Sequence, residues 1–131
     1  MKNLENLEKK INSELTTKIN KTEIKHNQIY IETDKDDFIE VCLFLKNNNE
    51  NKFRQLIDIT VIDYPERNQR FEVVYLFLSH EFNHRLILKY SISENEVIPS
   101  LTNIFPSANW MEREVFDMYG VSFKDHPDLR R

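Results

Sequence analysis

The stretch from Arg70 to Ser79 reads Arg-Phe-Glu-Val-Val-Tyr-Leu-Phe-Leu-Ser and is dense in β-branched, aromatic and other large apolar residues. Such residues are enriched in β-strands, so we predict a strand here. Two runs of the same kind flank it, from Leu56 to Tyr64 and from Arg85 to Ile92. Because the links between these runs are short, consecutive strands are expected to pair antiparallel. The middle of the chain is therefore predicted to form a β-sheet.

The N-terminal part shows helical spacing of apolar residues in two places, with a short alternating run between them. The alternating run, from Gln28 to Thr33, is predicted to be a strand. A first helix is expected before this run, and a second is expected to begin at Asp34. The apolar faces of the two helices would be formed by Leu4, Leu7, Ile11 and Leu15, and by Phe38, Val41, Cys42 and Leu45.

The C-terminal part contains the signals of a short helix from Asn109 to Tyr119, preceded by a brief helix from Pro99 to Phe105. Asn109 is a candidate N-cap, Glu112 is placed to reach back to it, and Gly120 offers the left-handed residue that ends a helix. The predicted packed face consists of Met111, Val115 and Met118, and the charged face of Trp110, Arg113, Glu114 and Asp117. About ten residues are too few for a stable isolated helix, so a sheet or a partner must support it.

The segment from Lys124 to Asp128 is predicted to be a turn, because Pro127 disfavours the helical conformation at His126. These elements together predict an α+β fold in two layers, with helices packed on a mostly antiparallel or mixed sheet. A chain of 131 residues is in the usual range for one domain, so a single domain over residues 1–131 is expected.

Composition excludes several kinds of site and partner. The net charge of −4 disfavours a general nucleic-acid role, which normally requires a basic surface. The one cysteine, Cys42, is expected to be buried in a helix, and one thiol excludes a disulfide framework or a cysteine-ligated iron–sulfur cluster within the chain. The one glycine, Gly120, excludes a glycine-rich loop for phosphate or a dinucleotide.

Membrane association is expected to be indirect. The sequence has no apolar run of about 18 residues, the length that spans a bilayer. The N-terminus is too acidic and too helical for a secretory or transit signal, which fits bacterial or organelle-encoded synthesis.

The C-terminal residues carry a spaced set of charged and aromatic positions. The set consists of Glu112-Arg113-Glu114, Asp117, Met118-Tyr119, Gly120, His126-Pro127-Asp128 and Arg130. This pattern closely resembles the signature of one subunit family of respiratory NADH-quinone oxidoreductase (complex I), known as the 30 kDa subunit, the C subunit or mitochondrial NADH dehydrogenase subunit 9. Leu56 to Thr60 and Arg70 to Tyr75 also resemble family sequence. The family continues beyond this segment, so the chain, which ends at Arg131, is expected to lack the family's C-terminal extension.

The resemblance implies a subunit of the peripheral arm of a proton-pumping NADH:quinone oxidoreductase, with a scaffolding role in the quinone-reducing module. It implies no cofactor in this chain, and FMN and iron–sulfur clusters in partner subunits. The implied partners are the quinone-site (D) subunit and neighbouring iron–sulfur subunits, on the cytoplasmic face of a bacterial inner membrane or the matrix face of a mitochondrial one. A homologous subunit of a membrane-bound hydrogenase or a formate hydrogenlyase is the narrower alternative, and a free-standing adaptor domain is another.

The charged residues of the motif admit two interpretations. Glu112, Glu114 and Asp117, with Arg113 and the C-terminal arginines Arg130 and Arg131, would form an ion-pair network at a subunit interface. The alternative is an ordinary charged helix face, which contributes little to stability. The residues alone favour that alternative, and the family resemblance favours the interface. The aromatic residues Trp110, Phe116, Tyr119 and Phe123 are candidates for either interface anchors or core.

Two metal sites are conceivable from the sequence. His80-Glu81-Phe82-Asn83-His84 matches the His-Glu-x-x-His pattern of zinc hydrolases, which requires a helix to place both imidazoles on one face. It lies between two β-like runs, so a hairpin connection is the favoured interpretation. His126 could bind a metal with Asp125 or Asp128, but polar groups in a turn more often bond to local amides.

Overall fold

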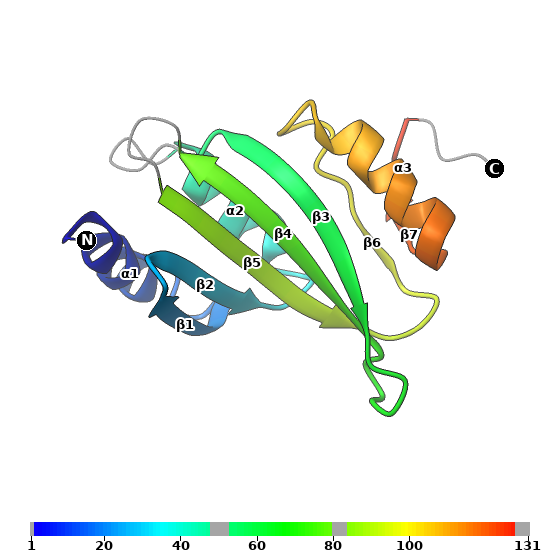
Figure 1. Ribbon diagram of the computed structural model, residues 1–131, viewed down its shortest axis with the longest axis horizontal. Coiled ribbons are helices and arrows are strands. Elements are labelled where there is room, and N and C mark those ends of the chain that lie inside the picture. The colour runs from blue at the N-terminus through cyan, green and yellow to red at the C-terminus, as the bar shows by residue number, and fades with distance from the viewer. Residues whose placement is uncertain (1, 48–52, 80–83, 128–131) are drawn as a thin grey trace.

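The computed structural model describes residues 2–47, 53–79 and 84–127, in which one five-stranded sheet dominates (Figure 1). Its strands are β1 (Ile19–Lys25), β2 (Gln28–Thr33), β3 (Gln55–Asp63), β4 (Phe71–Ser79) and β5 (His84–Ile92). They lie in the order β1-β2-β5-β4-β3, with β2 and β5 parallel and every other neighbouring pair antiparallel. The predicted mixed α+β fold is confirmed.

The three strands predicted from β-rich runs are confirmed as β3, β4 and β5. Their antiparallel register brings Val61 opposite Val73 and Tyr75 opposite Leu88. Alternate residues of these strands are buried, which gives the sheet one face that carries the core.

Strand β1 was not predicted, and a tight hairpin joins it to β2. His26 and Asn27 form the connection and have φ angles of 54° and 61°. Two consecutive residues with positive φ are the requirement of a type I′ turn, whose twist matches that of paired strands. β1 escaped prediction because it lies at the sheet edge and buries little, so its apolar alternation is weak.

Helix α2 (Phe38–Asn47) lies behind the sheet in Figure 1, and helix α1 (Lys2–Glu14) lies at the end of the sheet formed by β1 and β2. The residues of both predicted apolar faces are buried: Leu4, Leu7, Ile11, Leu15, Phe38, Val41, Cys42 and Leu45. The second helix begins at Phe38 and not at Asp34. The backbone carbonyl of Asp34 instead accepts a hydrogen bond from the N–H of Asp37 (3.1 Å) in a turn that leads into the helix.

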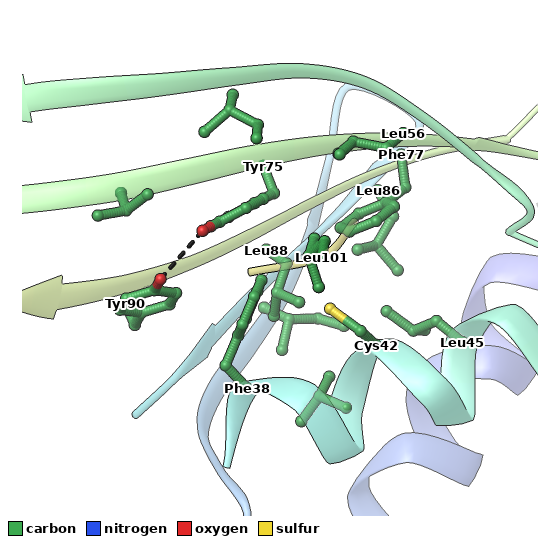
Figure 2. Close-up of a cluster of buried hydrophobic side chains, with 14 of the residues drawn as sticks. Phe38, Cys42, Leu45, Leu56, Tyr75, Phe77, Leu86, Leu88, Tyr90 and Leu101 are labelled. Atoms are coloured by element: carbon green, nitrogen blue, oxygen red, sulfur yellow. Dashed lines mark hydrogen bonds between the residues drawn. The ribbon is translucent and has the colours of Figure 1, made fainter. Parts of the chain in front are cut away.

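The core between α2 and the sheet is centred on three aromatic rings (Figure 2). The ring of Phe38 lies 4.4 Å from that of Tyr75 and 4.8 Å from that of Tyr90, and the two tyrosine hydroxyls share a hydrogen bond of 3.0 Å. That bond satisfies two polar atoms that would otherwise be buried unpaired. Cys42 is buried beside this cluster, as predicted, and burial raises the pKa of its thiol.

The C-terminal part consists of β6 (Val97–Pro99), α3 (Ala108–Tyr119) and β7 (Ser122–Lys124), with β6 and β7 paired in parallel. The predicted helix from Pro99 to Phe105 is wrong. Pro99 ends β6, and the N–H groups of Ile104 and Phe105 both bond to the carbonyl of Leu101 in a single turn. Pro106 disfavours helical conformation at the residue before it, so the turn stops there. Of the helices in the described residues, none has the length and apolarity needed to cross a bilayer.

Candidate functional site

Helix α3 carries most of the family-like motif and is attached to the sheet edge at its first turn. Ser107 is the N-cap position, and its hydroxyl donates to the carbonyl of Leu56 in β3 (2.9 Å) and not to the helix. The prediction that Asn109 caps the helix with help from Glu112 is therefore wrong. The predicted end at Gly120 is confirmed: its φ is 72°, and its N–H donates to the carbonyl of Phe116 (2.9 Å).

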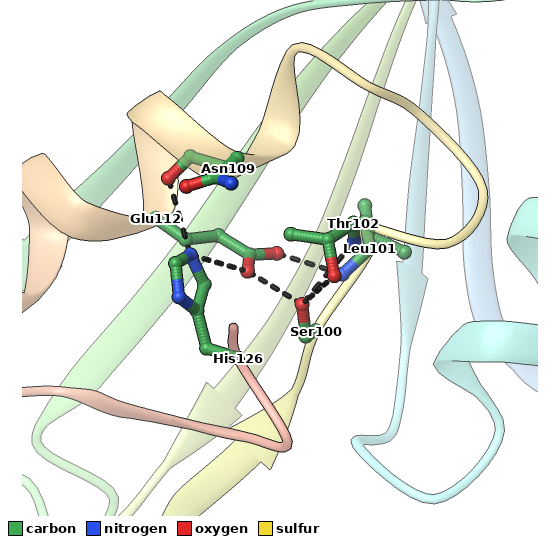
Figure 3. Close-up of polar contacts among 6 residues, drawn as sticks. All are labelled: Ser100, Leu101, Thr102, Asn109, Glu112 and His126. Carbon is green, nitrogen blue, oxygen red and sulfur yellow. Dashed lines mark hydrogen bonds and ion pairs between the residues drawn. The ribbon is translucent and has the colours of Figure 1, made fainter. Parts of the chain in front are cut away.

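Glu112 lies in the interior, not on the charged surface where the sequence placed it. Its side chain is fully buried, and its two carboxylate oxygens accept hydrogen bonds from the hydroxyl of Ser100 and the backbone N–H of Leu101, each at 2.7 Å (Figure 3). Burial raises the pKa of Glu112 to about 7, although the two donors oppose the shift by favouring the charged form.

His126 lies against the same carboxylate (Figure 3). Its Nε2 is 3.8 Å from Glu112 Oε1 and 3.1 Å from the backbone carbonyl of Asn109. Because a carbonyl can only accept, Nε2 carries a hydrogen in this arrangement. A turn after β7, with Asp125 at a φ of 58°, brings the histidine back to α3.

These contacts form what we call the Glu112 network, composed of Ser100, Leu101, Asn109, Glu112 and His126. It joins three segments that are separate in the sequence: the turn after β6, helix α3 and the turn after β7. The network fixes α3 from its inner side. The sequence marked Glu112 and His126 as motif members, but nothing in it signalled Ser100 and Leu101 as their partners.

The outward side of α3, which we call the α3 outer face, consists of Trp110, Glu114, Asp117 and Met118. Trp110 is 64% exposed and Met118 is 72% exposed, and both acids are exposed as well. The prediction that Met118 packs inward is wrong, whereas Val115 is buried as predicted.

The remaining motif residues take varied positions. Arg113 and Tyr119 are half-buried, and the Tyr119 ring packs edge-on against Phe71 at 6.5 Å. Pro127 is exposed. Of the other aromatic candidates, Phe123 is buried and Phe116 half-buried. Asp128, Arg130 and Arg131 lie outside the described residues.

Neither conceivable metal site is assembled in the described part of the chain, where no group of three or more His, Cys, Asp or Glu residues converges. His84 is the first residue of β5 and pairs with Ser79 of β4. The zinc-hydrolase pattern requires both histidines on one face of a helix, whereas His84 lies in a strand. His80 and Glu81 lie outside the described residues.

Comparisons with known proteins agree with the motif. A family described as the 30 kDa subunit of respiratory-chain NADH dehydrogenase matches residues 31–131. The chain is 49% identical over 110 residues to the C subunit of NADH-quinone oxidoreductase from Dinoroseobacter shibae, a match that covers 84% of this chain and 51% of that protein. It is 41% identical over its whole length to the C subunit from Rhodospirillum rubrum and spans 62% of it.

Solved structures share the fold. A trypsin-resistant fragment (1-134) of Nqo5 superposes with a TM-score of 0.80 and 27% identity, over 97% of this chain and 99% of the fragment. A chain of the membrane-bound sulfane sulfur reductase, an archaeal respiratory membrane complex, superposes with a TM-score of 0.82 and 22% identity, over 93% of this chain and 71% of that one. On the match over residues 31–131, the chain belongs to the family of the 30 kDa subunit of respiratory-chain NADH dehydrogenase.

Proposed function

We propose that this chain is a scaffold subunit of the peripheral arm of a proton-translocating NADH:quinone oxidoreductase, where it supports the quinone-reducing module. Family membership and the names of its relatives support this proposal. In it, electrons pass from NADH to quinone through FMN and iron–sulfur clusters held by partner subunits. This chain carries none of them, consistent with its one cysteine and one glycine.

The observation that carries the proposal is the contrast between the two sides of α3. The Glu112 network holds the helix from within, and the outer face exposes Trp110 and Met118 beside two carboxylates. Tryptophan and methionine are enriched in protein interfaces, and a tryptophan is a frequent hot spot of binding energy. A helix held from within that has such a face is suited to docking against another subunit.

The partners in this proposal are the quinone-site (D) subunit and neighbouring iron–sulfur subunits. The chain associates with the membrane through them, on the cytoplasmic face in a bacterium or the matrix face in a mitochondrion. A membrane-bound hydrogenase or a formate hydrogenlyase is the alternative host. A chain of an archaeal respiratory membrane complex named for another activity, sulfane sulfur reduction, has the same fold. For this reason we retain the alternative host.

The test is native affinity purification of the tagged chain from its own host, followed by mass spectrometry and an NADH:quinone reductase assay. Co-purification of flavin, iron–sulfur and quinone-site subunits with reductase activity is the expected result. Hydrogenase subunits in their place would assign the chain to the alternative complex. A chain that purifies alone from gently solubilised membranes would contradict both assignments.

A further inference from the structure

A surface groove of about 230 Å³ lies between the outer edge of β3 and helix α3. Its floor is formed by the buried residues Ile59, Val61 and Val115. Its walls include Asp58 from β3 and Glu114 and Met118 from α3. The groove thus adjoins the α3 outer face and has an apolar base with a carboxylate on each side.

The two carboxylates give the groove an unbalanced negative charge. Asp58 is held in place, since its Oδ1 accepts from the N–H of Ile59 (2.9 Å) and its Oδ2 from the hydroxyl of Thr60 (3.3 Å). Within residues 2–47, 53–79 and 84–127, neither Asp58 nor Glu114 forms an ion pair, whereas Arg70 and Lys35 are each paired with acids elsewhere. A cation brought by a partner would complement this charge.

Apolar area lies directly beside these acids. Met118, which lines the groove, is 72% exposed. Methionine adapts its shape to an incoming apolar side chain. Arginine and lysine have apolar stems with a charged end, so they fit a surface that is apolar at its base and acidic at its walls.

The backbone of β3 favours recognition by side chains over addition of a further strand. The carbonyl of Leu56 already accepts from Ser107, and the N–H of Ile59 is already bonded to Asp58. These two bonds occupy edge groups that a pairing strand would need. A partner therefore meets the groove through its side chains.

We propose that this groove binds a segment of a neighbouring subunit in which an arginine or lysine stands next to an apolar side chain. The cation lies toward Asp58 and Glu114, and the apolar side chain packs on Met118. The proposal rests on the proposed function, because it specifies the chemistry of the partner that the α3 outer face meets.

The test replaces the groove acids in the full chain and measures how much of the purified complex each tagged variant retains. Glu114→Lys reverses one wall charge. Asp58→Asn removes the other charge but keeps an oxygen that can accept from Ile59 N–H. Glu23→Lys, at an exposed position of β1 on the opposite sheet edge, is the matched control for Glu114→Lys.

We expect Glu114→Lys to weaken retention of partner subunits about tenfold or more, with a smaller loss for Asp58→Asn and none for Glu23→Lys. Retention by the wild-type chain should fall as salt rises, and that salt dependence should be reduced in Glu114→Lys. Unchanged thermal midpoints of the purified chains will separate loss of binding from loss of folding.

Two results would overturn the proposal. One is equal retention by Glu114→Lys, Asp58→Asn and Glu23→Lys from a host in which the wild-type chain does co-purify with the complex. The other is self-association of the wild-type chain that Glu114→Lys abolishes without changing retention, which would assign the groove to a second copy. Failure of the proposed function itself is distinct, because then the wild-type chain retains no partner subunits.

Discussion

Glu112 is an acid that the fold keeps away from water and supplies with two hydrogen-bond donors, one from Ser100 and one from the backbone of Leu101. A buried carboxylate without hydrogen-bond donors destabilises the folded state, and so does a buried donor without its acceptor. The acid and its donors therefore stabilise the fold only when both are present. This dependence fixes the turn after β6 against α3.

Removal of the Glu112 side chain should therefore destabilise the protein. Glu112→Ala leaves the buried Leu101 N–H without its acceptor and removes one partner of the half-buried Ser100 hydroxyl, which also contacts the Thr102 hydroxyl. This should lower the free energy of unfolding by about 1–3 kcal/mol. Glu112→Gln should lose much less, because its amide keeps an oxygen acceptor of nearly the same shape. Urea unfolding of the three proteins measures this. Equal stabilities for alanine and glutamine at this position would show that the hydrogen bonds contribute little.

The pH dependence of stability should also change at this residue. The pKa of Glu112 is raised from 4.5 to about 7 in the folded chain, so the folded state holds this proton more tightly than the unfolded state. Its contribution is fully present below pH about 4.5 and is lost as the pH rises through about 7.

The wild-type protein should therefore lose stability relative to Glu112→Gln between about pH 5 and 7.5, by about 3 kcal/mol or less. His126, Ser100 and Leu101 face the side chain at position 112 and are kept in both proteins. His126 contacts a carboxyl group in the wild-type protein and an uncharged amide in Glu112→Gln. Urea unfolding across this pH range gives the difference directly. Parallel stability curves for the two proteins would contradict the raised pKa.

For single residues, the sequence predicted the conformation correctly where it depends on local chemistry. It failed to predict the placement of a side chain that depends on contacts with residues distant in the sequence. Gly120 was predicted because a helix end needs a left-handed residue, and the backbone there has a φ of 72°. The placement of Glu112 failed because an acid is rarely buried, and its donors come from a turn 11 and 12 residues away that the pattern does not reveal.

At the scale of elements, the end of α3 depends on Gly120. Gly120→Ala would place a Cβ in a left-handed conformation, which should lower the free energy of unfolding by about 1–2 kcal/mol. Thermal or urea unfolding measures the loss. Ser107→Ala is a useful comparison, because Ser107 bonds to Leu56 and does not cap the helix with its side chain. A neutral effect of Gly120→Ala would mean that the helix end relaxes without cost.

The β1–β2 hairpin offers a stabilising change. Asn27 has a φ of 61° at the second position of the two-residue connection, where glycine is the preferred residue of a type I′ turn. Asn27→Gly should therefore leave stability unchanged or raise it by about 0.5 kcal/mol, whereas Asn27→Val should lower it. Urea unfolding of both variants beside the wild-type chain measures the two effects. Loss of stability in Asn27→Gly that matches the loss in Asn27→Val would contradict this turn geometry.

The orientation of α3 shows why the spacing of apolar residues alone predicted the wrong packed face for this helix. The buried residues of the helix are Ala108, Glu112 and Val115, which follow one another at helical spacing. Because the acid was counted as polar, the apolar face was centred too close to Met118, which is in fact exposed. In α1 and α2, the buried residues among those whose burial is described are all apolar, and the same reasoning gave the correct faces.

At the scale of the whole molecule, the sheet and the Glu112 network hold helix α3 so that one of its faces is exposed. The α3 outer face and the adjoining groove combine exposed Trp110 and Met118 with carboxylates. The proposed assignment of this surface to subunit contacts was available from the sequence only through the family-like motif. The exposure of Trp110 and Met118, which gives the surface its physical basis, required the structure.

The most direct test of the docking role is oxidative footprinting of the wild-type chain, alone and within its affinity-purified complex. Hydroxyl radicals oxidise exposed tryptophan and methionine, and mass spectrometry quantifies the oxidation of each residue. We predict that Trp110 and Met118, which are 64% and 72% exposed, become several-fold less reactive in the complex. Equal oxidation of both residues in the isolated chain and in the assembled complex would contradict docking through α3.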